Sequence, residues 1–304
     1  MSARSSKKPA VTKIGGKTLA LTNLDKILWP ADGYTKGDLI AYYRSVAKWI
    51  LPYLKDRPLS LERYPNGINK PGFFEKNAPQ STPPWVRTIS LEAGGKREHV
   101  RYILCNDEAT LAYVSNLGSI ALHVWMSRAG SLDKPDFILF DLDRGERCSL
   151  KTLATVALAL ADELRTEGMR PVAKTTGGSG LHVFIWLRSG YTYERARDFT
   201  REIALRMQER LPKLVTLERL IAKRPRDMVY MDWAQVGRGK TVVMPFVVRP
   251  RAKAPVSMPL TWAEVSRMSR LSESDPARYF ARWNLGSVPA RLRRSGDPWK
   301  GKAR

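Results

Sequence analysis

The chain has 304 residues, 43% of them hydrophobic, which is enough to bury a full core and excludes a disordered tail. The excess of 52 Lys and Arg over 29 Asp and Glu gives a formal net charge of +23, so we expect a polyanionic partner, with nucleic acid the first candidate. The sequence has no apolar run of about 18 residues and no apolar core in MSARSSKKPA, so it predicts no membrane span or signal peptide and a cytoplasmic, nucleoid-associated protein.

The first predicted elements follow a basic leader. Residues 1–17 carry five basic residues and no acid, which predicts a flexible arm that either contacts phosphates or is simply solvated. The segment TKGDLIAYYRSVAKWIL starts at Thr35 with a Thr-x-x-Asp cap and has apolar residues at helical spacing, so it predicts one amphipathic helix. Cys105 and Cys148 lack any zinc-ligand spacing and are predicted to be buried free thiols.

A loop-rich stretch comes next, RYPNGINKPGFFEKNAPQSTPPW, because Pro, Gly and Asn recur too often for long elements. Phe73 and Phe74 are adjacent in this polar loop. Two neighbouring aromatic side chains in a polar loop indicate contact with a partner.

The stretch DFILFDLDRG, residues 136–145, reads as a strand that ends in two carboxylates. Side chains on a strand alternate between its faces, so Asp141 and Asp143 point the same way. Two adjacent carboxylates repel unless a cation lies between them, and a divalent metal ion is the usual solution. The alternative is a structural pair that caps the strand end and binds arginines.

Glycines dominate the next segment, KTTGGSGLHVFIWL, which places a turn before a strand at 181–187. The backbone N–H groups of such a turn, with the hydroxyl groups of Thr176 and its neighbours, can bind phosphate oxygens. The segment lacks the Lys-Ser/Thr ending of a P-loop, so a glycine-rich turn without a ligand is the alternative. His182 could donate to the same phosphates. Because His182 shares its strand face with Phe184 and Trp186, a core histidine is the alternative.

The remaining elements are helices near 150–167 and 192–211, strands at 228–232 and 241–248, and a capped helix that begins at Thr261. Asp232 ends the strand MVYMD. A third carboxylate beside the first two would allow two metal ions about 4 Å apart, the arrangement that serves phosphoryl transfer. Strands and helices do not alternate regularly, so the sequence predicts an α+β fold.

Three of these segments together resemble a known family. The order and spacing of FDLD, TTGGSGLH and VYMDWAQVGRGKTVVMPFVVR are similar to the three motifs of the archaeo-eukaryotic primase superfamily, above all to the polymerase domain of bacterial ligase D. The resemblance runs from LTNLDKILWP to TWAEV and implies a primase-like core of mixed sheets flanked by helices. It places one domain at 18–290, with an N-terminal α/β module at about 18–130, a catalytic core at about 131–290 and a basic tail at 291–304.

By this resemblance, Asp141, Asp143 and Asp232 hold two Mg²⁺ or Mn²⁺ ions, and His123 lies in the catalytic centre. A nucleoside triphosphate is the implied substrate. Ser179 stands where the family carries Lys or Arg, and Thr176 replaces a serine. The implied nucleotide-binding residues are Thr176, His182, Gln235, Lys240 and Arg249.

The resemblance also implies a DNA-binding surface. Lys26 and Lys36 match the positions that grip the 5′-phosphate of the downstream strand, and Phe73 with Phe74 matches an aromatic pair that stacks on template bases. Base stacking on an aromatic side chain is worth about 1–3 kcal/mol and does not select sequence. Arg63, and one of Arg224 and Arg226, match basic loop residues that organise the paired ends or the nucleotide.

The implied function is template-directed nucleotidyl transfer that extends primers and fills gaps at DNA ends in non-homologous end joining, with ribonucleotides preferred. The expected partners are DNA with ends, gaps or a 5′-phosphate, Ku, and a separate ATP-dependent DNA ligase, with no membrane. One alternative is a non-catalytic DNA-end-binding protein. Another is a haloacid-dehalogenase-type phosphatase, because ILFDLDRG resembles the first motif of that family, although Arg144 and Gly145 replace its usual Gly-Thr.

Overall fold

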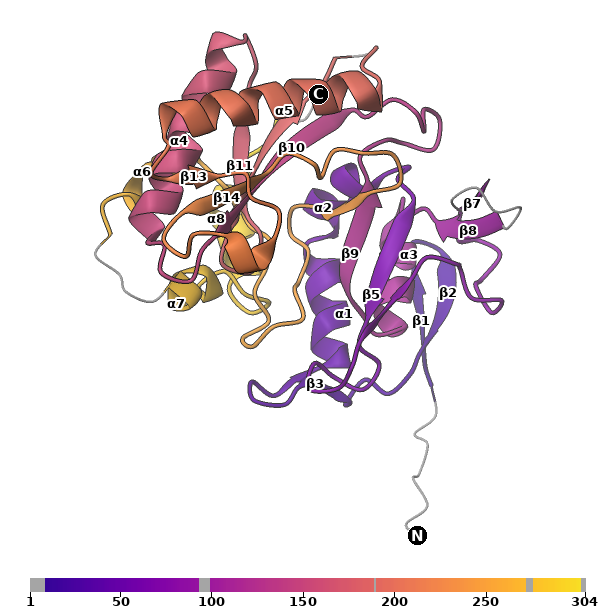
Figure 1. Cartoon of the computed structure of the whole chain (residues 1–304). Helices are drawn as coiled ribbons and strands as arrows, with labels where there is room; N and C mark the ends of the chain where they lie inside the picture. The colour runs from indigo at the N-terminus through magenta and orange to yellow at the C-terminus, as the bar shows by residue number, and fades with distance from the viewer. Residues whose placement is uncertain (1–8, 93–98, 189, 272–275, 302–304) are drawn as a thin grey trace.

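Two lobes lie side by side, each built around one large sheet (Figure 1). The computed structural model describes residues 9–92, 99–188, 190–271 and 276–301. Mixed sheets with separate helices confirm the predicted α+β class. Within these residues, no helix has both the length and the apolar character needed to cross a membrane.

The first lobe has a four-stranded antiparallel sheet in the order β15-β9-β5-β6. Its strands are β5 (Leu59–Arg63), β6 (Phe73–Glu75), β9 (Ser119–Trp125) and β15 (Thr241–Val243). Three helices accompany it: α1 (Lys36–Ser45), α2 (Ala47–Leu54) and α3 (Glu108–Asn116). The Tyr43 hydroxyl of α1 donates to the Ile120 carbonyl of β9 at 2.6 Å, which fixes this helix to the sheet.

Three two-stranded hairpins surround the first lobe. They are β1 (Ala10–Ile14) with β2 (Lys17–Leu21), β3 (Ile27–Trp29) with β4 (Tyr34–Thr35), and β7 (Thr88–Glu92) with β8 (His99–Ile103). The predicted flexible arm therefore does not extend to residue 17, because the chain is already paired as a strand from Ala10. Residues 1–8 of that arm lie outside the described residues.

The second lobe has a six-stranded sheet in the order β13-β14-β10-β12-β11-β16, in which only the β13–β14 pair is parallel. Its strands are β10 (Phe137–Arg144), β11 (Val172–Thr175), β12 (Leu181–Trp186), β13 (Val215–Thr216), β14 (Val229–Asp232) and β16 (Pro259–Leu260). Helices α4 (Leu150–Thr166) and α5 (Tyr193–Arg210) cover one face (Figure 1). The 3₁₀ turn η1 (Ile221–Lys223) and helices α6 (Trp262–Met268), α7 (Pro276–Ala281) and α8 (Val288–Ser295) complete the lobe.

Two predicted elements are shorter than expected. The single helix predicted from Thr35 is two helices, because Val46 leaves the helical conformation at φ −102° and ψ 4°. The predicted cap is present, since the Thr35 side chain accepts from the Asp38 amide. The strand predicted at 241–248 ends at Val243, and Phe246 adopts a left-handed φ of 68° that a strand does not allow.

The predicted basic tail is not a separate segment. Helix α8 crosses its expected start at residue 291, and Trp299 is fully buried with its indole N–H donating to the Ala173 carbonyl at 3.0 Å. The two predicted modules share structure as well, because β15 from the second half of the chain pairs with β9 in the first. Both cysteines are buried free thiols, as predicted.

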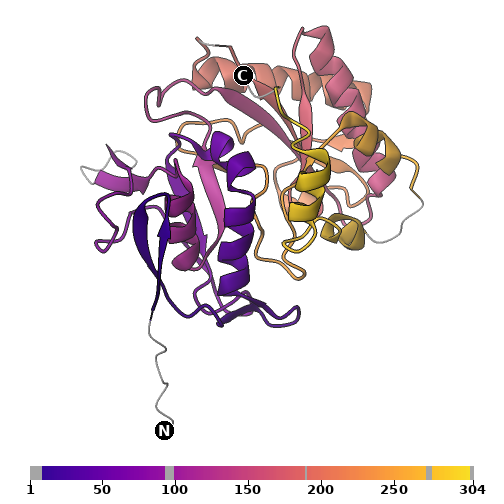
Figure 2. The ribbon, with the colours of Figure 1, turned by 180° about the vertical axis from the view of Figure 1, so that it is seen from behind.

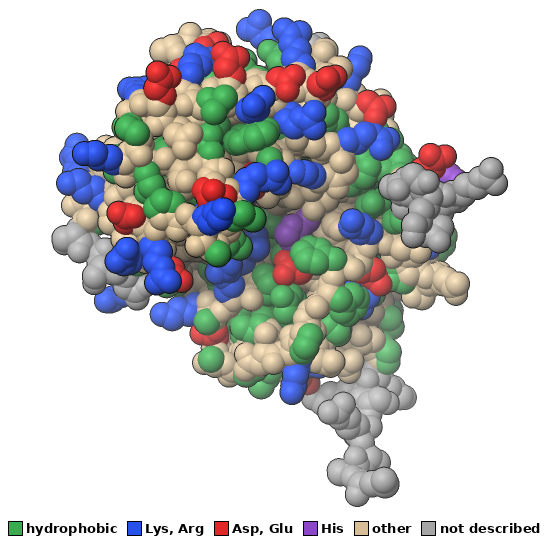
Figure 3. Space-filling view, in the orientation of Figure 1, with side chains coloured by type: hydrophobic (Ala, Val, Ile, Leu, Met, Phe, Trp, Pro, Cys, Tyr) green, Lys and Arg blue, Asp and Glu red, His purple; other side chains and the backbone are tan. Residues whose placement is uncertain are grey.

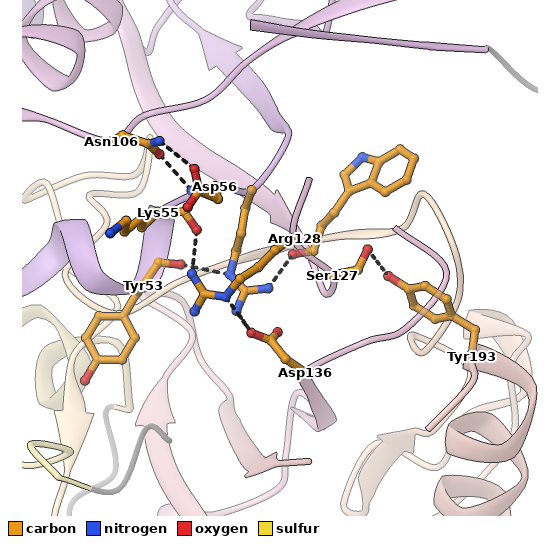
Figure 4. Close-up of polar contacts among 10 residues, drawn as sticks. Tyr53, Lys55, Asp56, Asn106, Ser127, Arg128, Asp136 and Tyr193 are labelled. Carbon is orange, nitrogen blue, oxygen red and sulfur yellow. Dashed lines mark hydrogen bonds and ion pairs between the residues drawn. The ribbon is translucent and has the colours of Figure 1, made fainter. Parts of the chain in front are cut away.

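A buried ion network joins the lobes where α2 and β9 end and β10 begins (Figure 4). The fully buried Arg57 contacts the Asp136 carboxylate at 2.6 Å and also donates to the Tyr53 and Trp125 carbonyls. Arg128 donates to the same carboxylate oxygen at 2.8 Å. Asp136 therefore fixes the start of β10, the strand that carries the aspartate pair.

Candidate active site

Four polar side chains form a row across the six-stranded sheet. Asp141 on β10 lies directly opposite Asp232 on β14 and directly opposite His182 on β12. His182 in turn lies opposite Lys174 on β11. Directly opposed residues of paired strands project from the same face, so the row Asp232–Asp141–His182–Lys174 shares one face, and Asp143, two residues after Asp141, joins it.

Basic side chains lie between the first lobe and this row of polar side chains. The Arg249 side chain lies near charged groups of both sheets. After burial and closer partners, its charge helps to lower the pKa of Glu62 and His123 on one side and of Asp141 and His182 on the other. Lys and Arg side chains gather around a histidine where the two lobes meet (Figure 3). The site is therefore a positively charged junction with carboxylates on one wall.

The carboxylates of this row repel one another electrostatically. Burial, followed by the nearby charges of Asp141 and Asp232, raises the pKa of Asp143 to about 6. Burial also pushes the pKa of Asp141 upward, but His182, Lys174 and Arg249 reverse the shift and hold it below its usual value. A cation beside these carboxylates would therefore stabilise their ionised forms, as it does for paired carboxylates at metal sites.

The donor set fits a hard divalent cation. Asp141 Oδ1 is buried without a hydrogen bond, although His182 Nε2 lies 3.2 Å away. Asp232 Oδ1 accepts from the Ala234 amide at 2.9 Å, so one of its two carboxylate oxygens already has a partner. Among the described residues, no three His, Cys, Asp or Glu side chains already converge on one metal position. All three candidate ligands offer carboxylate oxygens, the donors that Mg²⁺ and Mn²⁺ prefer.

His182 is buried beside the carboxylates. Burial, and then the nearby Lys174 charge, lower its pKa to about 4, so the imidazole is neutral at pH 7. Its Nδ1 has no partner among the described residues. A neutral ring with a free nitrogen can donate to, or accept from, a ligand in this junction.

The glycine turn lies beneath two arginines. Gly177 has φ 71°, and a Cβ there would approach the Arg249 Cγ to 2.4 Å. A Cβ on Gly178 would lie 3.2 Å from the Arg251 guanidinium carbon, and one on Gly180 would lie 2.5 Å from the Leu142 carbonyl oxygen. The missing side chains therefore let the turn approach both arginines and the backbone between the two aspartates.

The other predicted nucleotide-binding residues occupy different places. The Thr176 hydroxyl accepts from the Gly178 and Gly180 amides at 3.1 and 3.3 Å, so it closes the turn. Lys240 is exposed and donates to the Ala234 carbonyl, in the loop after Asp232. Gln235 is half-buried in the same loop. Lys240 and Gln235 thus both lie in the loop that follows Asp232.

His123 is held by a carboxylate that the sequence reading missed. Its Nε2 lies 3.0 Å from Glu62 Oε2, and the Tyr64 hydroxyl donates to the other oxygen of Glu62 at 3.1 Å. The Phe74 ring packs edge-on against the imidazole at 5.2 Å. The Glu62 carboxylate therefore fixes the orientation of His123 beside the aromatic pair.

The aromatic pair lies on β6, an outer strand of the first sheet. Phe73 and Phe74 are 45% and 59% exposed, as expected of side chains that wait for a partner. Arg63 donates to Glu75 at 2.8 Å and its guanidinium lies over the Phe73 ring at 5.3 Å. Arg63 thus supports β6 and Phe73.

Lys26 and Lys36 line one hollow of about 310 Å³, together with Arg63. Lys36 is held by the Thr22 hydroxyl and the Asn116 carbonyl at 3.1 and 3.0 Å. Burial, and then the charge of Lys26, lower the pKa of Lys36 to about 8. Two ammonium groups in one hollow suit a terminal phosphate.

Arg224 and Arg226 line a second hollow, of about 330 Å³, beside Asp143. The Arg224 guanidinium lies 3.5 Å from the Tyr230 ring centre, and its charge lowers the pKa of Asp143 after the larger raising effects of burial and Asp141. Arg226 is exposed and pairs with Glu146 at 3.5 Å. Of the two, Arg224 is the residue that faces the carboxylates.

Three site residues escaped the sequence reading: Glu62, Lys174 and Arg251. Lys174 is fully buried and donates to the Ser257 hydroxyl at 2.6 Å. Its position directly before TTGGSG, the turn that leads to His182, was a usable signal. Glu62 and Arg251 depend on contacts between distant segments, which no local pattern reveals.

Comparisons with known proteins agree with this geometry. Residues 35–299 match the family model described as the LigD primase-polymerase domain. The multifunctional non-homologous end joining DNA repair protein LigD of Mycobacterium tuberculosis is 32% identical over 289 residues, which is 92% of this chain and 36% of that protein. The bifunctional LigD of Bacillus subtilis is 33% identical over 92% of this chain and 43% of its own length.

One solved structure is similar to this chain over nearly its whole length. The polymerase domain from Mycobacterium tuberculosis ligase D in complex with DNA superposes with a TM-score of 0.84 at 30% identity, and the match covers 94% of this chain and 98% of that one. The chain therefore has the fold of that polymerase domain. It spans well under half the length of the curated relatives named above.

Proposed function

The chain belongs to the LigD primase-polymerase family, a family of nucleotidyltransferases, and we propose that it extends primers and fills gaps at broken DNA ends in non-homologous end joining. The observation that carries the proposal is the row of carboxylates on β10 and β14 opposite a turn that approaches Arg249 and Arg251. Phosphoryl transfer uses carboxylates that bind divalent ions and positively charged side chains that bind the triphosphate. Both kinds of side chain lie together here.

The chain's own residues bind and orient the reactants. The glycine turn, Arg249 and Arg251 would hold the triphosphate of the incoming nucleotide, and the neutral His182 would contact it from the sheet. Divalent ions held by Asp141, Asp143 and Asp232 would supply positive charge to the attacking and leaving oxygens. The primer 3′-hydroxyl then attacks the α-phosphate and pyrophosphate leaves, so positioning and electrostatics suffice without a covalent nucleophile.

The substrate is proposed to be DNA with a gap or overhang and a 5′-phosphate. Lys26 and Lys36 would hold that phosphate, and Phe73 with Phe74 would stack on template bases. By family likeness, ribonucleotides are the preferred substrates. Ku and a separate ATP-dependent DNA ligase are the proposed partners at a chromosomal break.

A primer-extension assay tests this function. A labelled primer on a gapped duplex should be extended according to the template, with Mg²⁺ or Mn²⁺, and faster with ribo- than with deoxynucleotides. The same gapped duplex with a 5′-hydroxyl in place of the 5′-phosphate shows how much the hollow of Lys26 and Lys36 contributes to the extension rate. Extension that ignores the template base would contradict the proposal.

Family membership removes the phosphatase alternative, since the match spans residues 35–299 and includes all three aspartates. A non-catalytic DNA-end-binding protein is the remaining rival. It predicts tight, salt-dependent end binding without any nucleotide incorporation. The same extension assay separates the two.

A further inference from the structure

A second aromatic surface lies at the far end of the strand that carries His182. Trp186 closes β12 and pairs in register with Phe137, whereas His182 pairs with Asp141. Four residues along a strand separate the two places by roughly 13 Å. Trp186 therefore lies on the same sheet as the carboxylates but outside their cluster.

Two hollows flank Trp186. One, of about 430 Å³, is lined by Trp49 and Tyr53 of α2 and by Trp299. The other, of about 700 Å³, is lined by Tyr191. The rear view shows the indigo helices of the first lobe beside the yellow C-terminal segment that forms the first hollow (Figure 2).

Aromatic rings form the floor of this surface. Tyr53 stacks on Trp186 with ring centres 6.2 Å apart and 28° between the planes, and Trp299 meets Tyr53 edge-on at 6.0 Å. Trp49 and Trp186 are each only partly buried, and the Lys48 ammonium lies over the Trp49 ring, 4.2 Å from its centre. Accessible rings held by other rings make rigid stacking platforms.

Exposed cations border both hollows: Lys48 and Lys300 at the first, Arg170 and Arg188 at the second. In the part of the chain that the structure describes, none of these four is in an ion pair. One acid lines each hollow: Glu167 pairs with Arg206 at 2.8 Å, and Asp297 accepts from the Tyr53 hydroxyl and keeps its charge, so two exposed cations face one acid at each hollow. The rim of both hollows is therefore positive.

We propose that this surface, defined by Trp49, Trp186 and Tyr191 with the four cations, binds single-stranded nucleic acid. Bases stack on the aromatic rings while phosphates contact Lys48 and Arg188 on either side of Trp186, the combination that binds single strands without sequence preference. Each hollow has both an aromatic ring and cations, and this repetition fits a polymer better than one free nucleotide. The surface would hold an unpaired strand away from the reacting end.

Binding and crosslinking test the proposal. A Phe73→Ala/Phe74→Ala protein removes the aromatic pair at the polymerase site, and the affinity of this protein for oligothymidylate is measured by fluorescence anisotropy. Adding Lys48→Glu and Arg188→Glu should weaken that affinity about tenfold or more, because two phosphate contacts become repulsive. Adding Lys151→Glu and Lys213→Glu, an equal change of charge at residues that line neither hollow, should change it by less than about twofold.

Photocrosslinking locates the bases directly. Oligothymidylate that carries 5-iodouracil should crosslink to the peptides that contain Trp186 or Trp49. Competition with thymidine monophosphate distinguishes the source of the base: displacement by the mononucleotide would support a site for free nucleotides, and displacement by an oligonucleotide alone would support a strand. Equal affinity of the Lys48→Glu/Arg188→Glu and control proteins, or crosslinks confined to other peptides, would overturn the proposal.

Discussion

At the scale of single residues, Asp143 is the carboxylate most sensitive to its surroundings. Burial and the charges of Asp141 and Asp232 raise its pKa to about 6, so the carboxyl group is half protonated at about that pH. A divalent ion competes with that proton for the same oxygens. Proton and metal binding at this residue are therefore linked.

This linkage predicts how activity depends on pH. With Mn²⁺ limiting, primer extension should rise with pH around a midpoint near 6, because Asp143 must lose its proton to bind the ion. Saturating Mn²⁺ should move the midpoint to lower pH. Rates measured across a series of Mn²⁺ concentrations check this, and a midpoint independent of metal concentration would contradict it.

Arg251 is a second residue with a testable role. The turn TTGGSG has no basic side chain of its own, and the Arg251 guanidinium lies against Gly178 in this turn. Arg251→Ala should raise KM for the nucleotide about tenfold while kcat changes little, because a phosphate contact made equally in ground and transition states affects binding alone. Steady-state kinetics test this, with Arg267→Ala on the exposed side of α6 as the control; a fall in kcat at constant KM would contradict it.

The sequence predicted some of these residues and missed others for a physical reason. Asp141 and Asp143 alternate on one strand, and His182 follows a glycine turn, so local patterns reveal them. Arg251 approaches the turn only because the 249–257 loop folds over it, with Ser257 N donating to Val247 O. Such contacts depend on tertiary packing, which local periodicity does not encode.

At the level of elements, the hollow between the segment after β2, the start of α1 and the end of α3 places Lys36 beside Lys26. Since burial and Lys26 lower the pKa of Lys36 to about 8, its ammonium is charged below that pH and neutral above it. A bound phosphate pulls the pKa upward again, so binding extends the charged range.

The preference for a 5′-phosphate over a 5′-hydroxyl in the gap should therefore fall as the pH rises from about 7 to about 9. Lys36→Met should reduce this preference roughly tenfold at pH 7 and remove its pH dependence, since a charge-assisted hydrogen bond is worth about 1.5–3 kcal/mol. Lys70→Met, at an exposed lysine, serves as the control. An unchanged preference in Lys36→Met would show that the hollow does not bind the phosphate.

Element boundaries were predicted well where caps and periodicity agree. Helix α6 begins with the predicted capping box of Thr261 and Glu264, and β14 coincides with the predicted strand ending at Asp232. The predicted helix from Thr35 failed at Val46, where no Gly or Pro marks a break in the sequence. Packing of Tyr42 and Tyr43 against the 246–248 segment fixes α1 there, and local propensity gives no sign of it.

At the scale of the whole molecule, the junction of Arg57, Arg128 and Asp136 holds the lobes together. Arg57 is fully buried, and burial lowers its pKa to about 10 even though Asp136 opposes the shift. Removing the Asp136 charge would leave this guanidinium buried without its partner. Strand β10, which carries Asp141 and Asp143, starts at the next residue, so the network also positions the two aspartates.

Asp136→Asn should lower the free energy of unfolding by about 3 kcal/mol, at the lower end for a broken buried pair because the Asp136 side chain is 33% exposed. Asp133→Asn breaks an exposed pair with Arg238 and should cost at most about 0.5 kcal/mol. Denaturant unfolding of both variants measures the difference. Equal stabilities would mean that the network does not hold the lobes.

We propose that template-directed nucleotidyl transfer by this molecule depends on Asp141, which lies in the row of polar side chains on the six-stranded sheet. The most direct test is extension of a gapped primer by wild-type protein and by Asp141→Asn, with DNA-end affinity measured on the same preparations. We predict templated extension by the wild type, a loss of at least about 1,000-fold in the variant, and end affinity within about twofold of wild type. Extension by Asp141→Asn at the wild-type rate, or none by the wild-type protein under any metal and nucleotide, would contradict the account.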